Sequence, residues 1–161
     1  MNDVALALGA NIGDRLAAMR RTVLAISDGI GAVSAKSLVY ETPPWARIDQ
    51  QRFLNACLVV ATELPPLDLL EAVKKIEMDI GRVRRAHWGP REIDIDIIFY
   101  GNIVLDAPSL KIPHAFMSIR SFVLVPLADI APDWRHPETG KTVRELLRDV
   151  STDGIERITK L

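Results

Sequence analysis

The chain has 161 residues, of which 48% are hydrophobic and 25% charged, and its formal net charge is −1. This composition is typical of one globular domain and excludes a disordered chain. The near-neutral charge gives no global basic field that would bind nucleic acid, and the single cysteine, Cys57, excludes an internal disulfide framework.

The first residues, MNDVALALGA, are too few and too acidic at their start for a secretory signal peptide. No apolar run approaches the length of a transmembrane helix. We therefore expect a cytoplasmic protein that does not enter a membrane. We also expect residues 1–161 to form one domain that acts as a monomer.

The predicted elements alternate between strands and helices. A strand at 4–8 precedes a turn and a helix from about Arg15, for which Asp14 is the expected N-cap. Gly81 is expected to end a second helix that begins within 64–68. The other expected elements are an extended segment 33–40, a strand 53–62, a strand 93–100, a turn at 101–102, a partner strand 103–105, an apolar segment 121–131 without an assigned element, and a helix near 143–150.

This order of elements predicts an α+β fold. It matches the ferredoxin-like βαββαβ arrangement, in which helices pack on one face of an antiparallel sheet. The residues after the last strand would add helices at the C-terminal end. The second face of the sheet would then be open for a binding site.

Two aspartates interrupt the apolar strand 93–100. Asp94 and Asp96 point to the same face, because side chains alternate along a strand, and their roots lie about 6.5–7 Å apart. A solvated outer face would explain one aspartate. Two adjacent carboxylates repel each other, and a hard cation such as Mg²⁺, which binds carboxylate and phosphate oxygens, explains the pair at least equally well. The other face carries Ile93, Ile95 and Ile97.

A basic segment, GRVRRAHWGPR at 81–91, directly precedes this strand. Arg82 and Arg91 stand at its two ends and are expected near the carboxylates, where guanidinium groups can bind phosphate oxygens. A solvated basic loop is the alternative interpretation. Carboxylates for Mg²⁺ beside arginines for phosphate predict a nucleoside-triphosphate site. This site would use no P-loop, because ETGKT at 138–142 lacks the first glycine of that motif. Glycines at 81 and 89 would let Arg84 and Trp88 close over a ligand.

Three other residues could form a flat slot for a heterocycle. Phe53 and Phe122 would supply the rings, although each phenylalanine taken alone is more often a core residue. Asn55 is more informative, because an asparagine between apolar strand neighbours needs hydrogen-bond partners if it is buried.

The segment HWGPREIDIDII at 87–98 resembles the signature of the 6-hydroxymethyl-7,8-dihydropterin pyrophosphokinase family of folate biosynthesis. The resemblance implies the ferredoxin-like fold. It also implies transfer of the diphosphate of ATP to the hydroxymethyl group of the pterin, with two Mg²⁺ ions and AMP as the second product. Nearly the whole chain is covered, because other blocks follow in the same order: ALGANIGDR, YETPPW, FLNA, IEMDIGRVR, IPH and RSFVLVPLADIAP.

The resemblance implies a role for each matching position. Asp94 and Asp96 would bind both metal ions and, with Arg82 and Arg91, would be catalytic. The expected ATP-binding residues are Glu77, Arg82, Arg84, Trp88, Arg91, Ile97, His114 and Arg120. The expected pterin-binding residues are Thr42, Pro43, Pro44, Trp45, Phe53, Asn55, Trp88, Asp94 and Phe122.

Some positions depart from the family pattern. Phe53 stands where some members have tyrosine, which keeps the ring and removes a hydroxyl group. The nucleotide side differs from other members at Lys74, Ser109, Lys111 and Ala115, so the adenine and ribose contacts are left unassigned.

Two other classes of protein stay open. An RNA-binding module with this fold would need a stacking aromatic motif and a basic surface, and the sequence has neither. A two-metal nuclease would use the aspartate pair but would not need a slot for a pterin. Release of AMP from ATP that depends on added hydroxymethyl-dihydropterin separates the three classes.

Overall fold

The computed structural model describes residues 1–42, 51–81 and 92–161. No helix in these ranges is long and apolar enough to cross a membrane. In chain order the elements are β1 (Asn2–Ala10), α1 (Arg15–Gly29), β2 (Gly31–Lys36), β3 (Leu38–Thr42), β4 (Phe53–Thr62), α2 (Pro66–Ile80), β5 (Asp94–Tyr100), β6 (Leu105–Asp106), β7 (Lys111–Ile112), a 3₁₀ turn η1 (Met117–Ile119), α3 (Ser121–Ile130), α4 (Val143–Arg148) and β8 (Glu156–Lys160).

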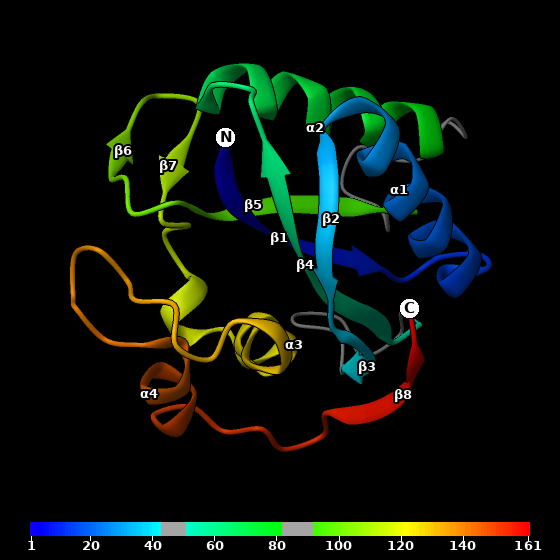
Figure 1. The fold of residues 1–161 in the computed structure, drawn as a ribbon. Coiled ribbons are helices and arrows are strands. Elements are labelled where there is room, and N and C mark those ends of the chain that lie inside the picture. Colours follow the sequence, from blue (N-terminus) through cyan, green and yellow to red (C-terminus); the bar gives the residue numbers. More distant parts are fainter. Residues whose placement is uncertain (43–50, 82–91) are drawn as a thin grey trace.

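The main sheet has the strand order β5-β1-β4-β3-β8, with β2 also paired to β4, and its pairings are antiparallel. Helices α1 and α2 lie on one side of this sheet, and α3 and α4 lie on the other (Figure 1). The predicted α+β class with added C-terminal helices is confirmed. The second face is open only in part, because α3 and η1 pack on it.

Strand β1 separates large side chains from small ones. Val4, Leu6 and Leu8 pack in the core beneath α1 and α2, whereas Ala5 and Ala7 face α3. Alternation of side chains along a strand produces this separation. The small residues leave space on the α3 side, and that space becomes important for the site.

Residues 33–40 do not form the single extended segment expected from their alternation. Two strands, β2 and β3, pair with successive parts of β4 and are separated at Ser37. The Ser37 N–H donates to the Cys57 carbonyl oxygen (2.9 Å), and the Ser37 hydroxyl oxygen accepts from the Cys57 N–H (2.8 Å). The serine side chain therefore satisfies a backbone group where the strand is interrupted.

The predicted division of β5 into two faces is confirmed. Asp94 lies opposite Gly9 of β1, and Asp96 lies opposite Ala7. Ile93, Ile95 and Ile97 pack in the core beneath α1 and α2. The pairing shifts by one residue near the end of the strand, so Ile98 and Phe99 both pack on the α3 side.

One assignment after β5 needs correction, and one segment left without an element is a helix. The expected turn is present at Gly101 (φ 53°), but residues 103–105 do not pair with β5. The chain leaves the sheet because Ile103 and Leu105 pack against the core, and β6 then pairs with β7. The apolar segment that had no assigned element forms α3, with Pro126 inside it.

His136 lies buried in the turn before α4. Its Nδ1 accepts hydrogen bonds from the backbone N–H groups of Glu138 (3.2 Å) and Thr139 (3.4 Å), and its ring packs edge-on against Phe99. Burial lowers the pKa of His136, and the negative charge of Glu138 opposes this shift only in part. The folded protein therefore favours the neutral imidazole.

We expect His136 to make the protein less stable in acid. Because the folded-state pKa is lowered, the stabilising contribution is complete above the unfolded pKa of about 6.5 and is lost as pH falls through the folded pKa. Urea unfolding of the wild type and His136→Asn, measured between pH 8 and pH 5, checks this. Asparagine can keep a hydrogen-bond acceptor but does not titrate, so the difference between the two unfolding free energies should change below pH 6.5. Parallel curves would contradict the expectation.

Candidate active site

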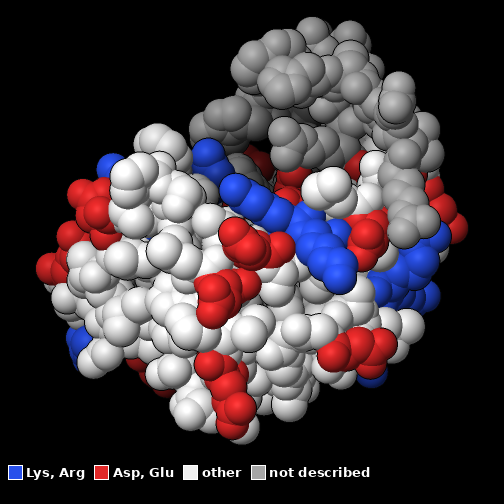
Figure 2. All heavy atoms as spheres, turned by 90° about the horizontal axis from the view of Figure 1, so that it is seen from above, with Lys and Arg blue, Asp and Glu red and all other residues white. Residues whose placement is uncertain are grey.

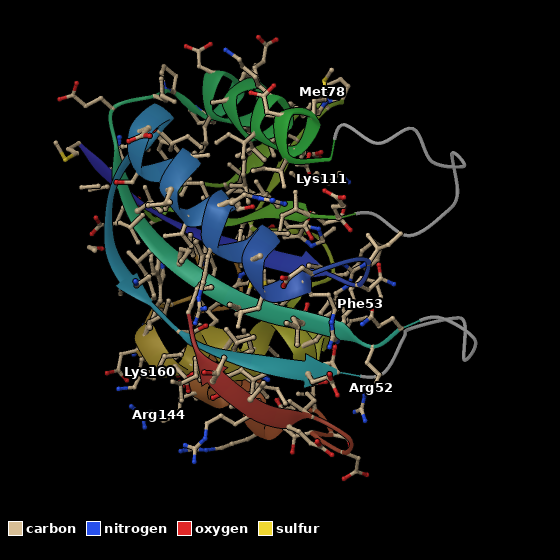
Figure 3. The ribbon with its side chains drawn as sticks, turned by 90° about the vertical axis from the view of Figure 1, so that its right-hand side faces the viewer. Arg52, Phe53, Met78, Lys111, Arg144 and Lys160 are labelled. Atoms are coloured by element: carbon tan, nitrogen blue, oxygen red, sulfur yellow. The ribbon has the colours of Figure 1, made fainter. Side chains whose placement is uncertain are left out.

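A pocket of about 230 Å³ opens on the α3 side of the sheet, where the small residues of β1 leave space. Residues from β1, β3, β4, β5 and the start of α3 meet there. We call it the first pocket; it is lined by Ala7, Leu8, Gly9, Thr42, Phe53, Asn55, Asp94, Asp96, Arg120, Phe122 and Val123. Figure 3 shows Phe53 next to Arg52 at the beginning of β4.

The two aspartates of β5 give the first pocket a negative charge. Asp94 and Asp96 are half-buried and share the face opposite Gly9 and Ala7. The charge of Asp96 reaches Cys57, whose thiol pKa is raised by burial and further by the charges of Asp129 and Asp96. Like charges this close favour a bound cation.

The described residues contain no group of three or more His, Cys, Asp and Glu side chains that could hold a metal ion. The described residues alone therefore do not supply a complete set of protein ligands for a metal ion. Two carboxylates on one strand fit the way Mg²⁺ is commonly held, by one or two carboxylates together with substrate phosphates.

A buried amide lies across the first pocket from these carboxylates. Asn55 is 6% exposed, and its Nδ2 donates a hydrogen bond of 2.6 Å to the Thr42 hydroxyl oxygen. A Cβ atom added to Gly9 would approach the Asn55 Oδ1 to 3.3 Å, so the glycine gives the amide its space. Because this contact fixes the amide beside the rings of Phe53 and Phe122, the pocket suits a flat heterocycle with a hydrogen-bonding edge.

A second pocket, of about 450 Å³, lies on the outer side of β5. Asp96 and Arg120 line both pockets, so the two hollows meet at these side chains. The other residues that line the second pocket are Leu70, Ile95, Ile97, Ala107, Pro108, Ser109, Leu110, Lys111, His114, Ala115 and Phe116.

His114 is held beside both charged residues. Its backbone N–H donates to the Ile98 carbonyl oxygen (3.0 Å), and its Nδ1 accepts from the Phe116 N–H (3.3 Å). Burial lowers the pKa of His114, Asp96 opposes this shift, and Arg120 adds to it. A neutral imidazole that accepts at Nδ1 carries its proton on Nε2, where it can donate to a ligand.

Glu77 and Lys74 of α2 line neither pocket. The Glu77 Oε2 accepts a hydrogen bond of 2.9 Å from the Ile95 N–H and so attaches α2 to β5. Lys74 lies in a third hollow together with Ser109. The expected nucleotide-binding role of Glu77 stays a prediction.

The remaining predicted residues separate into three groups. Thr42, Phe53, Asn55, Asp94, Asp96, Arg120 and Phe122 come together in the first pocket. Asp96, Ile97, His114 and Arg120 come together in the second. The residues that lie outside the described part of the chain are Pro43, Pro44, Trp45, Arg82, Arg84, Trp88 and Arg91.

Sequence reasoning missed a charged network beside the first pocket. One guanidinium nitrogen of Arg15 contacts both the Glu41 carboxylate (3.0 Å) and the Arg52 carbonyl oxygen (2.7 Å). The Arg52 side chain lies 3.7 Å from the same carboxylate and donates to the Gly154 carbonyl oxygen (2.6 Å). The network holds the end of β3 against the beginning of β4, next to Thr42 and Phe53.

Comparison with known proteins identifies the family of this chain. The family model described as 7,8-dihydro-6-hydroxymethylpterin-pyrophosphokinase (HPPK) matches residues 5–132. The chain belongs to the HPPK family. Two relatives with the name 2-amino-4-hydroxy-6-hydroxymethyldihydropteridine pyrophosphokinase come from Methylorubrum extorquens and Pseudomonas aeruginosa. The Methylorubrum protein is 48% identical over 95% of this chain and 96% of its own length. The Pseudomonas protein is 44% identical over 91% of this chain and 93% of its own length.

Solved structures share this HPPK fold. A Plasmodium falciparum HPPK-DHPS triple mutant with SDX-DHP has a TM-score of 0.75 at 19% identity. The match covers 91% of this chain and 44% of that chain, so the HPPK-family chain spans less than half of the larger protein. At 19% sequence identity, the structural similarity shows the fold alone.

Proposed function

We propose that this chain is a transferase that moves the β,γ-diphosphate of ATP to the hydroxymethyl group of 6-hydroxymethyl-7,8-dihydropterin. The products would be the pterin diphosphate and AMP, in a step of folate biosynthesis. One observation carries the proposal: a pocket with two carboxylates, a buried amide and two aromatic rings meets a second pocket at Asp96 and Arg120. The names of the HPPK relatives support it.

The first pocket supports binding of the pterin. A pterin is a flat bicyclic ring with donors and acceptors along one edge. Phe53 and Phe122 place aromatic rings in the wall of the pocket, and the buried residues Asn55 and Thr42 supply polar groups. Pro43, Pro44, Trp45 and Trp88 belong to this proposal by resemblance and lie outside the described residues.

The second pocket supports binding of the nucleotide. Arg120 lines both pockets, so its guanidinium group is available to the diphosphate, and the neutral His114 can donate from Nε2. Arg82 and Arg91 would add further donors by resemblance. Guanidinium groups stabilise the equatorial oxygens of the phosphoryl group in the transition state.

Asp94 and Asp96 would hold the Mg²⁺ ions of the proposed reaction. When bound, the two ions would offset the negative charge of the phosphate oxygens. The chain itself would hold the hydroxymethyl oxygen in line with the β-phosphorus. A new O–P bond forms as the bond from that phosphorus to the α–β bridging oxygen breaks. AMP leaves with that electron pair, and the hydroxymethyl proton passes to solvent. Positioning of the two substrates supplies much of the acceleration.

One assay tests the proposed function. The protein is incubated with ATP and Mg²⁺, and AMP is measured with and without 6-hydroxymethyl-7,8-dihydropterin. AMP release should require the hydroxymethyl compound, and 6-methyl-7,8-dihydropterin, which lacks the nucleophile, should not replace it. AMP release without any pterin, or cleavage of nucleic acid, would contradict the proposal.

The alternative of an RNA-binding module gains no support from the visible charges. On the face seen from above in Figure 2, acidic and basic side chains of the described residues are interspersed.

Residues 1–161 are proposed to form one domain that acts as a cytoplasmic monomer on small molecules, without nucleic acid or membrane. Light scattering after size-exclusion chromatography tests the monomer.

A further inference from the structure

Arg120 makes cation–π contacts with two aromatic rings. Its guanidinium carbon is 5.3 Å from the centroid of the Phe116 ring and 5.6 Å from the centroid of the Phe122 ring. Phe122 lines the first pocket, Phe116 lines the second, and Arg120 lines both. The cation is therefore in contact with one ring from each pocket.

The position of Phe116 is set by a short turn. Its N–H donates to the His114 Nδ1, and its carbonyl oxygen accepts from the Ile119 N–H (3.2 Å). The next residue, Met117, is fully buried in the core beneath α3 and anchors the turn. The His114 ring also packs edge-on against the Phe116 ring, with centroids 6.3 Å apart.

Burial in the core does not explain a phenylalanine at this position. Phe116 remains 54% exposed, and within the described part of the chain its ring contacts are with His114 and Arg120. A cation over an aromatic face is stabilised by the ring quadrupole, and the contact restricts a side chain that otherwise has many rotamers. The N–H donors at the edge of the guanidinium group stay available to a ligand.

We propose that Phe116 is a positioning residue that, together with Phe122, holds the Arg120 guanidinium at the boundary of the two pockets before substrates bind. This proposal rests on the proposed function, which places the transferred diphosphate at that boundary. A donor that is already in position acts most strongly on the transition state. Loss of Phe116 therefore affects turnover more than substrate affinity.

Steady-state kinetics of Phe116 variants test the role of the ring. Phe116→Ala should lower kcat by roughly 10-fold to 100-fold, as expected when a catalytic group is misplaced, with little change in the KM for the pterin. Phe116→Tyr keeps the ring and should restore kcat, whereas Phe116→Leu should not. Ile119→Ala is the matched control, because Ile119 is an exposed apolar residue (63%) in the same turn. Equal kcat values for Phe116→Ala and wild type would overturn the proposal.

A double-mutant cycle tests whether Phe116 acts through Arg120. In an Arg120→Ala background, Phe116→Ala should have no further effect on kcat, and additive effects would overturn the proposal.

A second readout of the position of Arg120 does not depend on activity. The side-chain ¹⁵Nε–¹H resonance of Arg120 in the ligand-free protein should shift when Phe116→Ala removes the ring current. An unchanged resonance overturns the proposal. Absence of AMP release by the wild type refutes the proposed function, while the resonance still decides the position of Arg120.

Discussion

Asp94→Asn and Asp96→Asn are each expected to leave a folded protein whose turnover is lower by at least roughly 100-fold, the scale of losing one transition-state-stabilising group. Both side chains lie on the pocket face of β5, opposite the small residues Gly9 and Ala7. Asparagine keeps the shape but removes the charge that would hold Mg²⁺. Because Asp96→Asn also removes repulsion between the two carboxylates, the ligand-free Asp96 variant should unfold at the same urea concentration as wild type or a higher one.

The aspartate prediction is checked by AMP release over a Mg²⁺ titration and by urea unfolding without ligands. Asp133→Asn is the matched control, since Asp133 lies far along the chain on an exposed segment, with a side chain 83% exposed and paired with Arg144. Near-normal turnover of either β5 variant at moderate Mg²⁺ would refute the metal assignment. A large loss in the Asp133 control would show that the assay responds to general changes of charge.

Asn55→Ala is expected to raise the KM for the pterin by about 10-fold to 100-fold, which corresponds to roughly 1–3 kcal/mol for the loss of one buried hydrogen-bonding group. Asn55 is the buried amide of the first pocket, and its removal also leaves the Thr42 hydroxyl without the 2.6 Å contact. The KM for ATP should change little, because the second pocket does not include Asn55.

Steady-state kinetics with each substrate varied in turn checks the prediction for Asn55. Thr42→Val removes the partner hydroxyl and should change the pterin KM in the same direction by a smaller factor. Asn102→Ala, in the exposed turn after β5, is the matched control. If Asn55→Ala raised both KM values equally, the amide would support the fold of the pocket instead of recognising the pterin.

The aspartate pair could be predicted from the sequence because the pattern is local. Alternation along one strand is enough to place Asp94 and Asp96 on one face and Ile95 on the other. The helix boundaries near Asp14 and Gly81 were also predictable from their capping residues, and the structure confirms both.

Other parts of the site depend on partners that are distant in sequence. The interruption at Ser37 is fixed by hydrogen bonds to Cys57, which no local pattern reveals. Helix α3 gave no clear 3.6-residue period, because it is apolar on most sides and contains Pro126. Arg15 and Glu41 are 26 residues apart in the sequence and come together in the folded structure.

The pocket itself had a sequence signal that went unused. In the first strand, VALALGA alternates large and small apolar residues, and two of the small ones, Ala7 and Gly9, line the space beside Asp94 and Asp96. A division of residues into only apolar and polar classes does not separate the two sets. Only their difference in volume indicates that one face is filled by a core and the other leaves room for a ligand.

The position of Cys57 gives the protein a native reporter of opening. The thiol is fully buried beneath α3, and its Sγ lies 3.6 Å from the Val123 carbonyl oxygen. A thiol-specific reagent can reach it only when α3 separates from β4 or when the whole domain unfolds. The rate of labelling under native conditions therefore reports the sum of both openings, one of which is separation of the helix that carries Phe122 from the sheet. A ligand that fills the first pocket and contacts Phe122 should slow that labelling, which would make binding measurable without any introduced probe.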